Sequence, residues 1–324
     1  MIGRRAWLVS FAAAVITARR VAAQPTGKTY RIGWLHPSAQ HPRFAFRNAL
    51  KQLGYVDGKN AVFEVRVAED RAERLPTLAA ELVRSNVDII VAVGPGAIIA
   101  AKQATATIPI VMAYWGGSDP VQAGIVASFA RPGGNVTGVH MLTTALEPKR
   151  LELLLAAVPH ANKVAVLAGP FTDKQQLVTV RRFAESTGVQ LHLAYVGEGT
   201  AGYDTAFESI RRVRSEVLLV PSSTRFVRER RVIIDLAAQQ RIPAIYEWPY
   251  MAHEGGLMAY GANQAEMDRQ AAVFVDKILK GPKPAELPVE QPTKFELVIN
   301  RTTAKALGLA IPPSLLLRAD SVID

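Results

Sequence analysis

Three of the four tryptophans, Trp34, Trp115 and Trp248, come at or just after the end of a short apolar run. In open parallel sheets, ligands bind beyond the carboxyl ends of the strands. A tryptophan offers a large flat apolar face and one polar edge, which suits a cyclic or aromatic solute. Core packing is the alternative for each ring, because alternation along a strand can turn a side chain away from a cleft.

A glycine-containing turn follows another apolar run and opens a predicted helix at Gly94-Pro95-Gly96-Ala97. Free backbone amides and the positive end of the helix dipole suit an anion such as a carboxylate. The turn is not a dinucleotide fingerprint, because Ile99 stands where G-x-G-x-x-G needs its last glycine. No Gly-Lys-Ser/Thr follows, so it is not a phosphate-binding P-loop either. A tight strand-to-helix turn without a ligand is the alternative.

Polar residues follow other apolar runs and complete the candidate set. Asp119, directly before Pro120, is either a helix N-cap or the partner of a ligand ammonium group. His36 could donate a hydrogen bond to a ligand or be a surface or structural histidine. We expect the ligand to contact residues of both halves of the chain: Trp34, His36, Ser38, Gly94, Gly96, Ala97, Trp115, Asp119, Gly169, Ser222, Tyr246 and Glu247.

The sequence lacks the motifs of common catalytic sites. It contains no cysteine, no G-x-S-x-G, no H-E-x-x-H and no S-x-x-K, and its six histidines show no metal-ligand spacing. We therefore predict that the protein is not an enzyme and has no catalytic residues, no metal site and no cofactor. Basic residues without interleaved aromatic side chains predict solvated helix faces and no nucleic-acid partner.

Strand-like and helix-like segments alternate from Tyr30 to the end of the chain. Continuous apolar runs separated by helices indicate parallel sheets that are covered on both faces. The runs Val87–Val93 and Ile108–Val111 have counterparts in Glu216–Pro221 and Ile242–Ile245. This internal similarity suggests an α/β protein with two similar doubly wound lobes.

The first 23 residues are typical of an export signal. Arg4 and Arg5 precede an apolar run, Ala6–Ile16, and small residues lead to Ala23. The run is too short to span a bilayer, and an N-terminal amphipathic helix is the alternative. We expect cleavage near Ala23 and a periplasmic protein, exported by the general secretory or the twin-arginine route. Without a cysteine, the chain cannot be a lipoprotein.

Several segments resemble the ABC-transporter substrate-binding family that includes tryptophan- and tyrosine-binding members. They are Asp119–Gly124, Arg131–Gly138, Gly255–Gly261, Asp276–Gly281, Leu287–Asn300 and Ala304–Leu309. The resemblance covers essentially the whole chain after the export signal. It implies the type I periplasmic-binding-protein fold, a small-molecule ligand, permease subunits in the membrane as partners, and no catalysis. We expect a monomer.

The resemblance also implies a hinge with three crossings between the lobes, near Met141–Thr143, Tyr260–Asn263 and Gln291–Thr293. We place lobe 1 at residues 28–141 plus 262–292 and lobe 2 at 142–261 plus 293–324. The tryptophans suggest an aromatic amino acid or a related cyclic solute as ligand. A periplasmic sensory receptor is the alternative function, and an extracytoplasmic enzyme on the same scaffold is a third.

Overall fold

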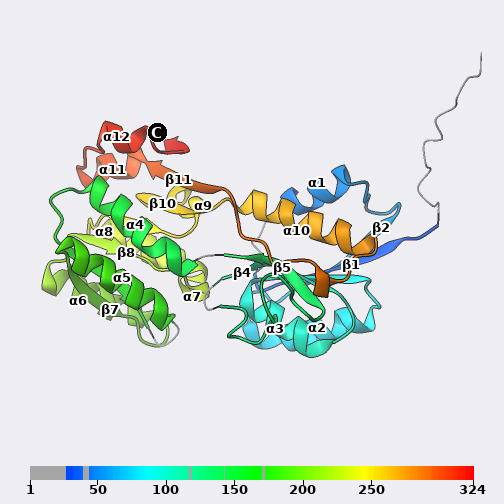
Figure 1. The fold of residues 1–324 in the computed structure, drawn as a ribbon. Coiled ribbons are helices and arrows are strands. Elements are labelled where there is room, and N and C mark those ends of the chain that lie inside the picture. The colour runs from blue at the N-terminus through cyan, green and yellow to red at the C-terminus, as the bar shows by residue number, and fades with distance from the viewer. Residues whose placement is uncertain (1–26, 39–43, 117–118, 142, 170–171) are drawn as a thin grey trace, which may run out of the picture.

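A computed structural model describes residues 27–38, 44–116, 119–141, 143–169 and 172–324 of the protein. The predicted export signal therefore lies outside the described residues. Two α/β lobes lie side by side (Figure 1), each built on its own sheet. The predicted fold class is confirmed, whereas the residue boundaries of the lobes and of the export signal stay predictions.

The first lobe has a parallel sheet of order β2-β1-β3-β4-β5. Helices α1 and α10 cover one face, and α2 and α3 cover the other (Figure 1). Both faces are therefore buried, as the apolar run of β3 predicts. The elements are β1 (Tyr30–His36), α1 (Phe44–Gln52), β2 (Ala61–Val67), η1 (Ala72–Arg74), α2 (Leu75–Arg84), β3 (Ile89–Val93), α3 (Gly94–Ala104), β4 (Ile110–Trp115), β5 (Val136–His140), α10 (Gln264–Leu279) and η2 (Pro284–Glu286).

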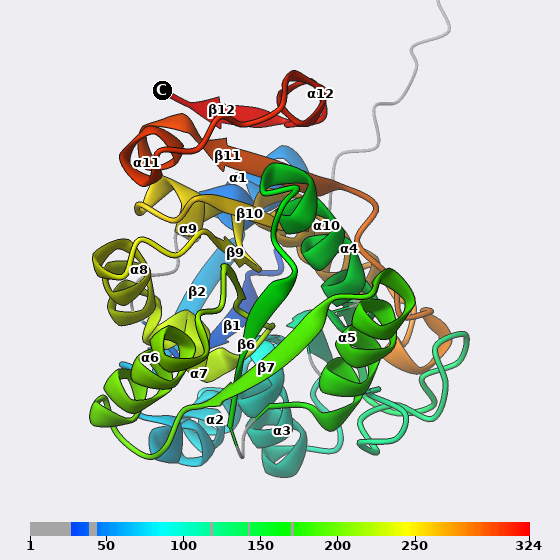
Figure 2. The same cartoon turned by 90° about the vertical axis from the view of Figure 1, so that its left-hand side faces the viewer.

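The second lobe has a sheet of order β12-β11-β10-β9-β8-β6-β7. Figure 2 shows α4 and α5 on one side of this sheet and α6, α8 and α9 on the other. The elements are α4 (Thr143–Ala157), β6 (Lys163–Ala168), α5 (Lys174–Thr187), β7 (Gln190–Tyr195), α6 (Ala201–Val213), β8 (Val217–Leu219), α7 (Thr224–Arg228), α8 (Arg230–Gln239), β9 (Ala244–Tyr246), α9 (Pro249–His253), β10 (Met258–Ala262), β11 (Phe295–Asn300), α11 (Arg301–Leu307), α12 (Pro313–Leu316) and β12 (Ser321–Ile323).

One strand pair departs from the expected parallel arrangement. Strand β11 runs antiparallel to β10, with Tyr260 opposite Leu297. The reason is the path of the chain, which leaves lobe 2 after β10, forms α10 on the sheet of lobe 1, and returns along a connection to β11 (Figure 1). Strand β10 runs toward lobe 1 and β11 comes back from lobe 1, so the two neighbouring strands run in opposite directions.

Helix α10 begins where the sequence predicts it and belongs spatially to lobe 1. Asn263 caps its start, because the Asn263 side chain accepts a hydrogen bond of 2.7 Å from the backbone N–H of Glu266. The helix packs on α1, β4 and β5. A segment far along the chain is thereby brought beside the strand ends of lobe 1.

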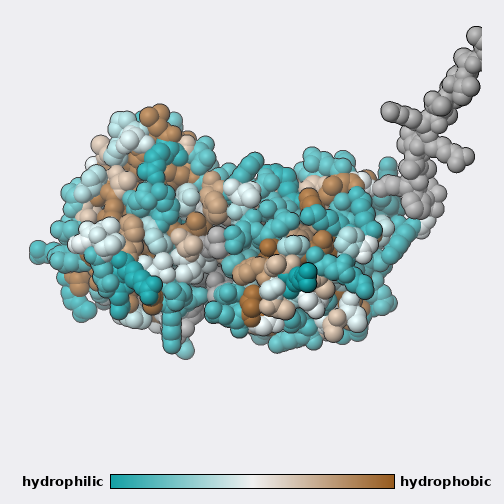
Figure 3. All heavy atoms as spheres, in the orientation of Figure 1, coloured by the Kyte–Doolittle hydropathy of each residue, from teal (hydrophilic) through white to brown (hydrophobic). Residues whose placement is uncertain are grey.

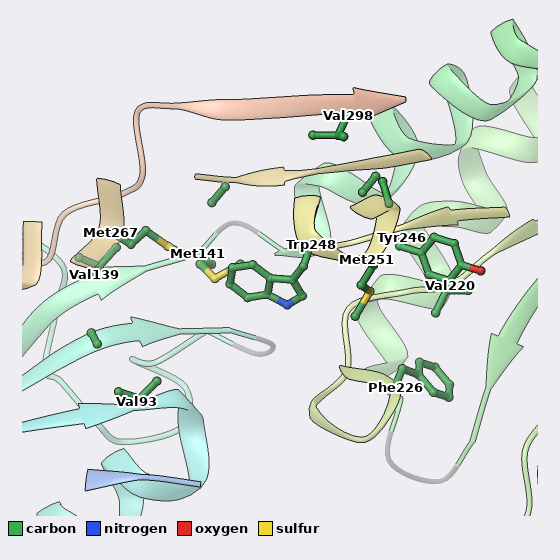
Figure 4. Packing of buried hydrophobic residues seen from close by; sticks show 14 of the residues in the cluster. Val93, Val139, Met141, Val220, Phe226, Tyr246, Trp248, Met251, Met267 and Val298 are labelled. Atoms are coloured by element: carbon green, nitrogen blue, oxygen red, sulfur yellow. The ribbon is translucent and has the colours of Figure 1, made fainter. Parts of the chain in front are cut away.

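The largest buried apolar cluster runs through both lobes. Figure 4 shows Met141 of lobe 1 beside the indole of Trp248 of lobe 2, with Met267 of α10 nearby. In the space-filling view, the outline narrows between the two lobes, and hydrophilic side chains cover much of the face shown (Figure 3). No helix in the described part of the chain is long and apolar enough to cross a membrane.

Candidate functional site

Aromatic side chains from the two lobes meet at the carboxyl ends of their strands. The ring of Tyr114, in β4, lies 5.5 Å from that of Trp248, which follows β9. Trp248 in turn stacks on Tyr250 of α9, with ring centroids 6.1 Å apart and planes 15° apart. The Arg230 guanidinium lies 5.3 Å from the centre of the Tyr250 ring and forms an ion pair of 2.8 Å with Glu254. These contacts fix the orientation of the rings at the junction.

A pocket of about 370 Å³ opens beside these rings. Lobe 1 contributes the first residues of α1 and α10, and lobe 2 contributes α9 and one residue of β11. The Phe44 side chain is 77% exposed at the start of α1, so its ring is free to cover a ligand. The lining residues are Phe44, Ala45, Pro249, Tyr250, His253, Asn263, Gln264, Ala265, Asp268 and Glu296.

Asp268 is the unusual polar residue of this pocket. It is only 4% exposed, yet its side chain has no hydrogen-bond or ion-pair partner within the described ranges. Burial raises the pKa of Asp268 from 3.8 to about 7, and the positive charge of Arg269 opposes this rise. At neutral pH this carboxyl group therefore lies close to its own midpoint of ionisation.

A second polar cluster lies at the strand ends of lobe 2. The Arg150 guanidinium pairs with Glu147 at 2.8 Å, and both side chains are fully buried. The Ser222 N–H donates to the same Glu147 carboxylate at 2.9 Å, and the Ser222 hydroxyl donates to Glu247. Burial raises the pKa of Glu247, and the positive charge of Arg150 partly offsets this rise. The Arg150 guanidinium thus offsets part of the cost of burying two carboxyl groups.

This cluster also holds the hinge strand. The Arg150 Nε–H donates to the carbonyl oxygen of Tyr260, in β10, at 2.7 Å. The next residue, Gly261, lies so close to β9 that a Cβ atom there would overlap the carbonyl oxygen of Glu247. The crossing from β10 to α10 therefore starts from a rigid part of lobe 2.

Several of the predicted site residues are buried in the apolar core. Trp34 is 1% exposed, Trp115 2% and Tyr246 1%, and Ala97 is also buried. The ring centroid of Trp34 lies 4.7 Å from that of Phe46 and 6.3 Å from that of His36, on which the indole stacks. All three aromatic side chains belong to the buried apolar clusters, and ligand contact by them stays a prediction. An irregularity in β4 gives the reason for the burial of Trp115: the register with β5 shifts between Met112 and Trp115, so that Tyr114 packs on the same cluster as Ala113 and contacts Trp248, whereas Trp115 packs in the core of lobe 1.

Other predicted residues have local roles at the strand ends. The His36 Nδ1 atom accepts a hydrogen bond from the Ser38 N–H at 2.9 Å. Asp119 accepts from the Val121 N–H at 2.7 Å, which is the capping alternative of the sequence argument. The Gly169 carbonyl oxygen accepts from the Thr172 N–H at 3.0 Å.

The structure brings some of these residues together. Ser222 and Glu247 share a hydrogen bond. Gly94, with φ +78°, opens α3 beside the Tyr114 hydroxyl, and Gly96 is exposed in the first turn of that helix. Ligand contact by the predicted residues stays a prediction.

Sequence reasoning missed Phe44, Tyr114, Tyr250 and Asp268. A signal for Asp268 exists, because a carboxylate stands beside Met267 on the apolar face of a clear helical pattern. Tyr114 and Tyr250 carry no comparable signal in one sequence. Among the described residues, no group of three or more potential ligands could hold a metal ion.

Known proteins resemble the chain along most of its length. A tyrosine-binding protein of Clostridioides difficile is 27% identical over 278 residues, covering 85% of this chain and 78% of the relative. The structure of an ABC domain in complex with L-Trp from Streptococcus pneumoniae superposes with a TM-score of 0.81 at 25% identity, covering 91% of this chain and all of that one. A conserved domain protein from Vibrio cholerae gives a TM-score of 0.80 at 28% identity with the same coverage.

The sequence profile of a family described as "ABC transporter substrate binding protein" matches residues 34–323. The match takes in both lobes, the three predicted crossings and the pocket between the lobes. The two-lobed fold agrees with it, as do the structures that superpose on most of the chain. The chain therefore belongs to the ABC transporter substrate-binding protein family.

Proposed function

We propose that this protein is the exported solute-binding component of an ABC importer and that its ligand is an aromatic amino acid. The observation that carries the proposal is the pocket between the lobes, to which Phe44 of lobe 1 and Tyr250 of lobe 2 contribute rings. A volume of about 370 Å³ suits a single small molecule. The relatives supply the ligand class, since one is a tyrosine-binding protein and another was crystallised with L-Trp.

Binding between two lobes couples ligand capture to closure. Each lobe supplies part of the lining, so the complete site forms only when the lobes approach. Phe44 is the side chain with most surface to lose in that step, because it is 77% exposed without ligand. The importer role adds a membrane permease as partner, which would recognise the closed, ligand-bound form. The absence of catalysis fits this role and is part of the proposal.

Isothermal titration calorimetry on protein recovered after export tests the ligand. L-Tryptophan, L-tyrosine and L-phenylalanine should bind, and L-leucine should bind much more weakly. Tyr250→Ala should lower the affinity roughly tenfold, because a ring pair contributes about 0.5–1.5 kcal/mol beyond its packing. Tyr195→Ala is the matched control, since that tyrosine is exposed on β7 at the far edge of the lobe 2 sheet. Equal binding of leucine and tryptophan by the wild type would refute the aromatic assignment.

A second experiment tests whether the two lobes close around the ligand. Small-angle X-ray scattering with and without the bound amino acid should show a more compact protein with ligand. A ligand at a hundredfold excess over its dissociation constant should also raise the free energy of unfolding by about 2.7 kcal/mol. Identical scattering profiles at saturating ligand would argue against hinge closure.

A further inference from the structure

The carboxyl group of Asp268 differs from two other acids of the same helix and pocket, the buried Asp276 and the half-buried Glu296. Asp276, two turns along α10, accepts hydrogen bonds from the Tyr55 hydroxyl at 3.1 Å and the Lys280 ammonium at 2.9 Å. Glu296 accepts from the side-chain amide of Asn263. Asp268 is 4% exposed, lines the pocket, and has no such partner in the described part of the chain.

A buried carboxylate without a partner costs free energy, and natural proteins retain one where it serves a function. A cation from the ligand would remove this cost by supplying the missing partner. We propose that Asp268 recognises the ammonium group of the ligand, so that this pocket selects amine-bearing solutes. The proposal rests on the proposed function in one respect, that this pocket is the ligand site.

The chemistry of the lining favours an organic ammonium over a metal ion. Within the described residues, no cluster of three potential metal ligands exists. The Asn263 side-chain oxygen accepts a hydrogen bond of 2.7 Å from the Glu266 N–H, and its amide nitrogen donates to Glu296. Neither atom is therefore available to a metal ion. Phe44 and Tyr250 supply apolar surface, which suits the carbon skeleton attached to an amine. The Asp268 carboxylate, beside aromatic rings and with Glu296 already paired to Asn263, is therefore a site for a monovalent organic cation.

The proposal makes binding depend on pH. Tyr114 of β4 and Arg269 on the same helix interact electrostatically with Asp268, and Tyr250 and His253 of α9 and Glu296 of β11 line the same pocket. Burial holds the pKa of Asp268 at about 7 in the free protein. An ammonium ligand needs the ionised carboxylate, so its affinity should fall about tenfold for each pH unit below 7.

Calorimetry on the exported protein separates this inference from the proposed function. The probes are L-tryptophan, tryptamine, which lacks the carboxylate, and indole-3-propionate, which lacks the ammonium, together with the remaining amino acids. Asp268→Asn should weaken L-tryptophan and tryptamine roughly 100-fold, because the ammonium is then buried without a partner. The affinity for indole-3-propionate should be unchanged or higher. The pH slope below 7 should disappear in the variant.

Asp276→Asn is the matched control, a buried carboxyl group on the same helix with its partners inside the protein. It should leave the preference for amines and the pH slope as in the wild type. The inference is overturned if Asp268→Asn binds L-tryptophan as the wild type does, or if no amine-bearing probe binds the wild type. If aliphatic amino acids bind, aromatic ones do not, and Asp268→Asn still abolishes binding, the inference stands and the aromatic assignment fails.

Discussion

Replacing Asp268 by asparagine should make the ligand-free protein more stable at pH 8. Folding raises the pKa of this group from 3.8 to about 7, so its unfolded form loses the proton first as the pH rises. The contribution to stability is fully present below pH 3.8 and is lost as the pH rises through 7. Since each pKa unit is worth about 1.4 kcal/mol, the loss amounts to about 4 kcal/mol by pH 8.

An amide at the same position stays neutral and avoids that loss. The unpaired amide of the Asp268→Asn variant would itself cost about 1–3 kcal/mol, so the net gain in the free energy of unfolding at pH 8 should be about 1–3 kcal/mol. At pH 4 the order should reverse or vanish, because the protonated acid and the amide are both neutral. Urea unfolding at pH 4, 6 and 8, without ligand, measures the difference.

Asp276→Asn should destabilise the protein, because that change removes the ion pair with Lys280 and one of the two acceptor oxygens. A stability difference between Asp268→Asn and the wild type that does not change from pH 4 to pH 8 would refute the reasoning. It would mean that Asp268 has an ordinary pKa and a partner in solution.

Three further predictions concern stability and export. Arg150→Met should lower the free energy of unfolding by roughly 3–5 kcal/mol in urea titrations, because Glu147 and Glu247 lose their shared cation. Gln176→Leu should raise it by about 1–3 kcal/mol, since both amide atoms of this fully buried side chain lack partners in the described structure; a lower midpoint would contradict this. N-terminal sequencing of protein from the periplasm should begin at Gln24, and a retained Met1 would exclude the predicted cleavage.

The fold could be predicted from the sequence because its signals are local. Continuous apolar runs such as Val87–Val93 give buried parallel strands, and β3 is buried at every position. The helix over Gln264–Leu279 has clear start and stop signals and was found at those bounds. The antiparallel β11 has no local signal, because strand direction depends on the path of the chain between the lobes.

The candidate site also combines features that have a local sequence signal with features that have none. The sequence by itself predicted ligand contacts with aromatic and polar residues at strand ends, which stays a prediction, and the family segments indicated the class of protein. Only the tertiary structure decided that Tyr114, and not Trp115, faces the other lobe, because an irregularity between Met112 and Trp115 breaks the alternation of β4 and leaves no local signal in the sequence. Likewise, Asp119 caps a turn, whereas Asp268 enters the pocket from a helix that the hinge returns to lobe 1. Pairings between residues so distant along the chain arise from packing, which one sequence does not encode locally.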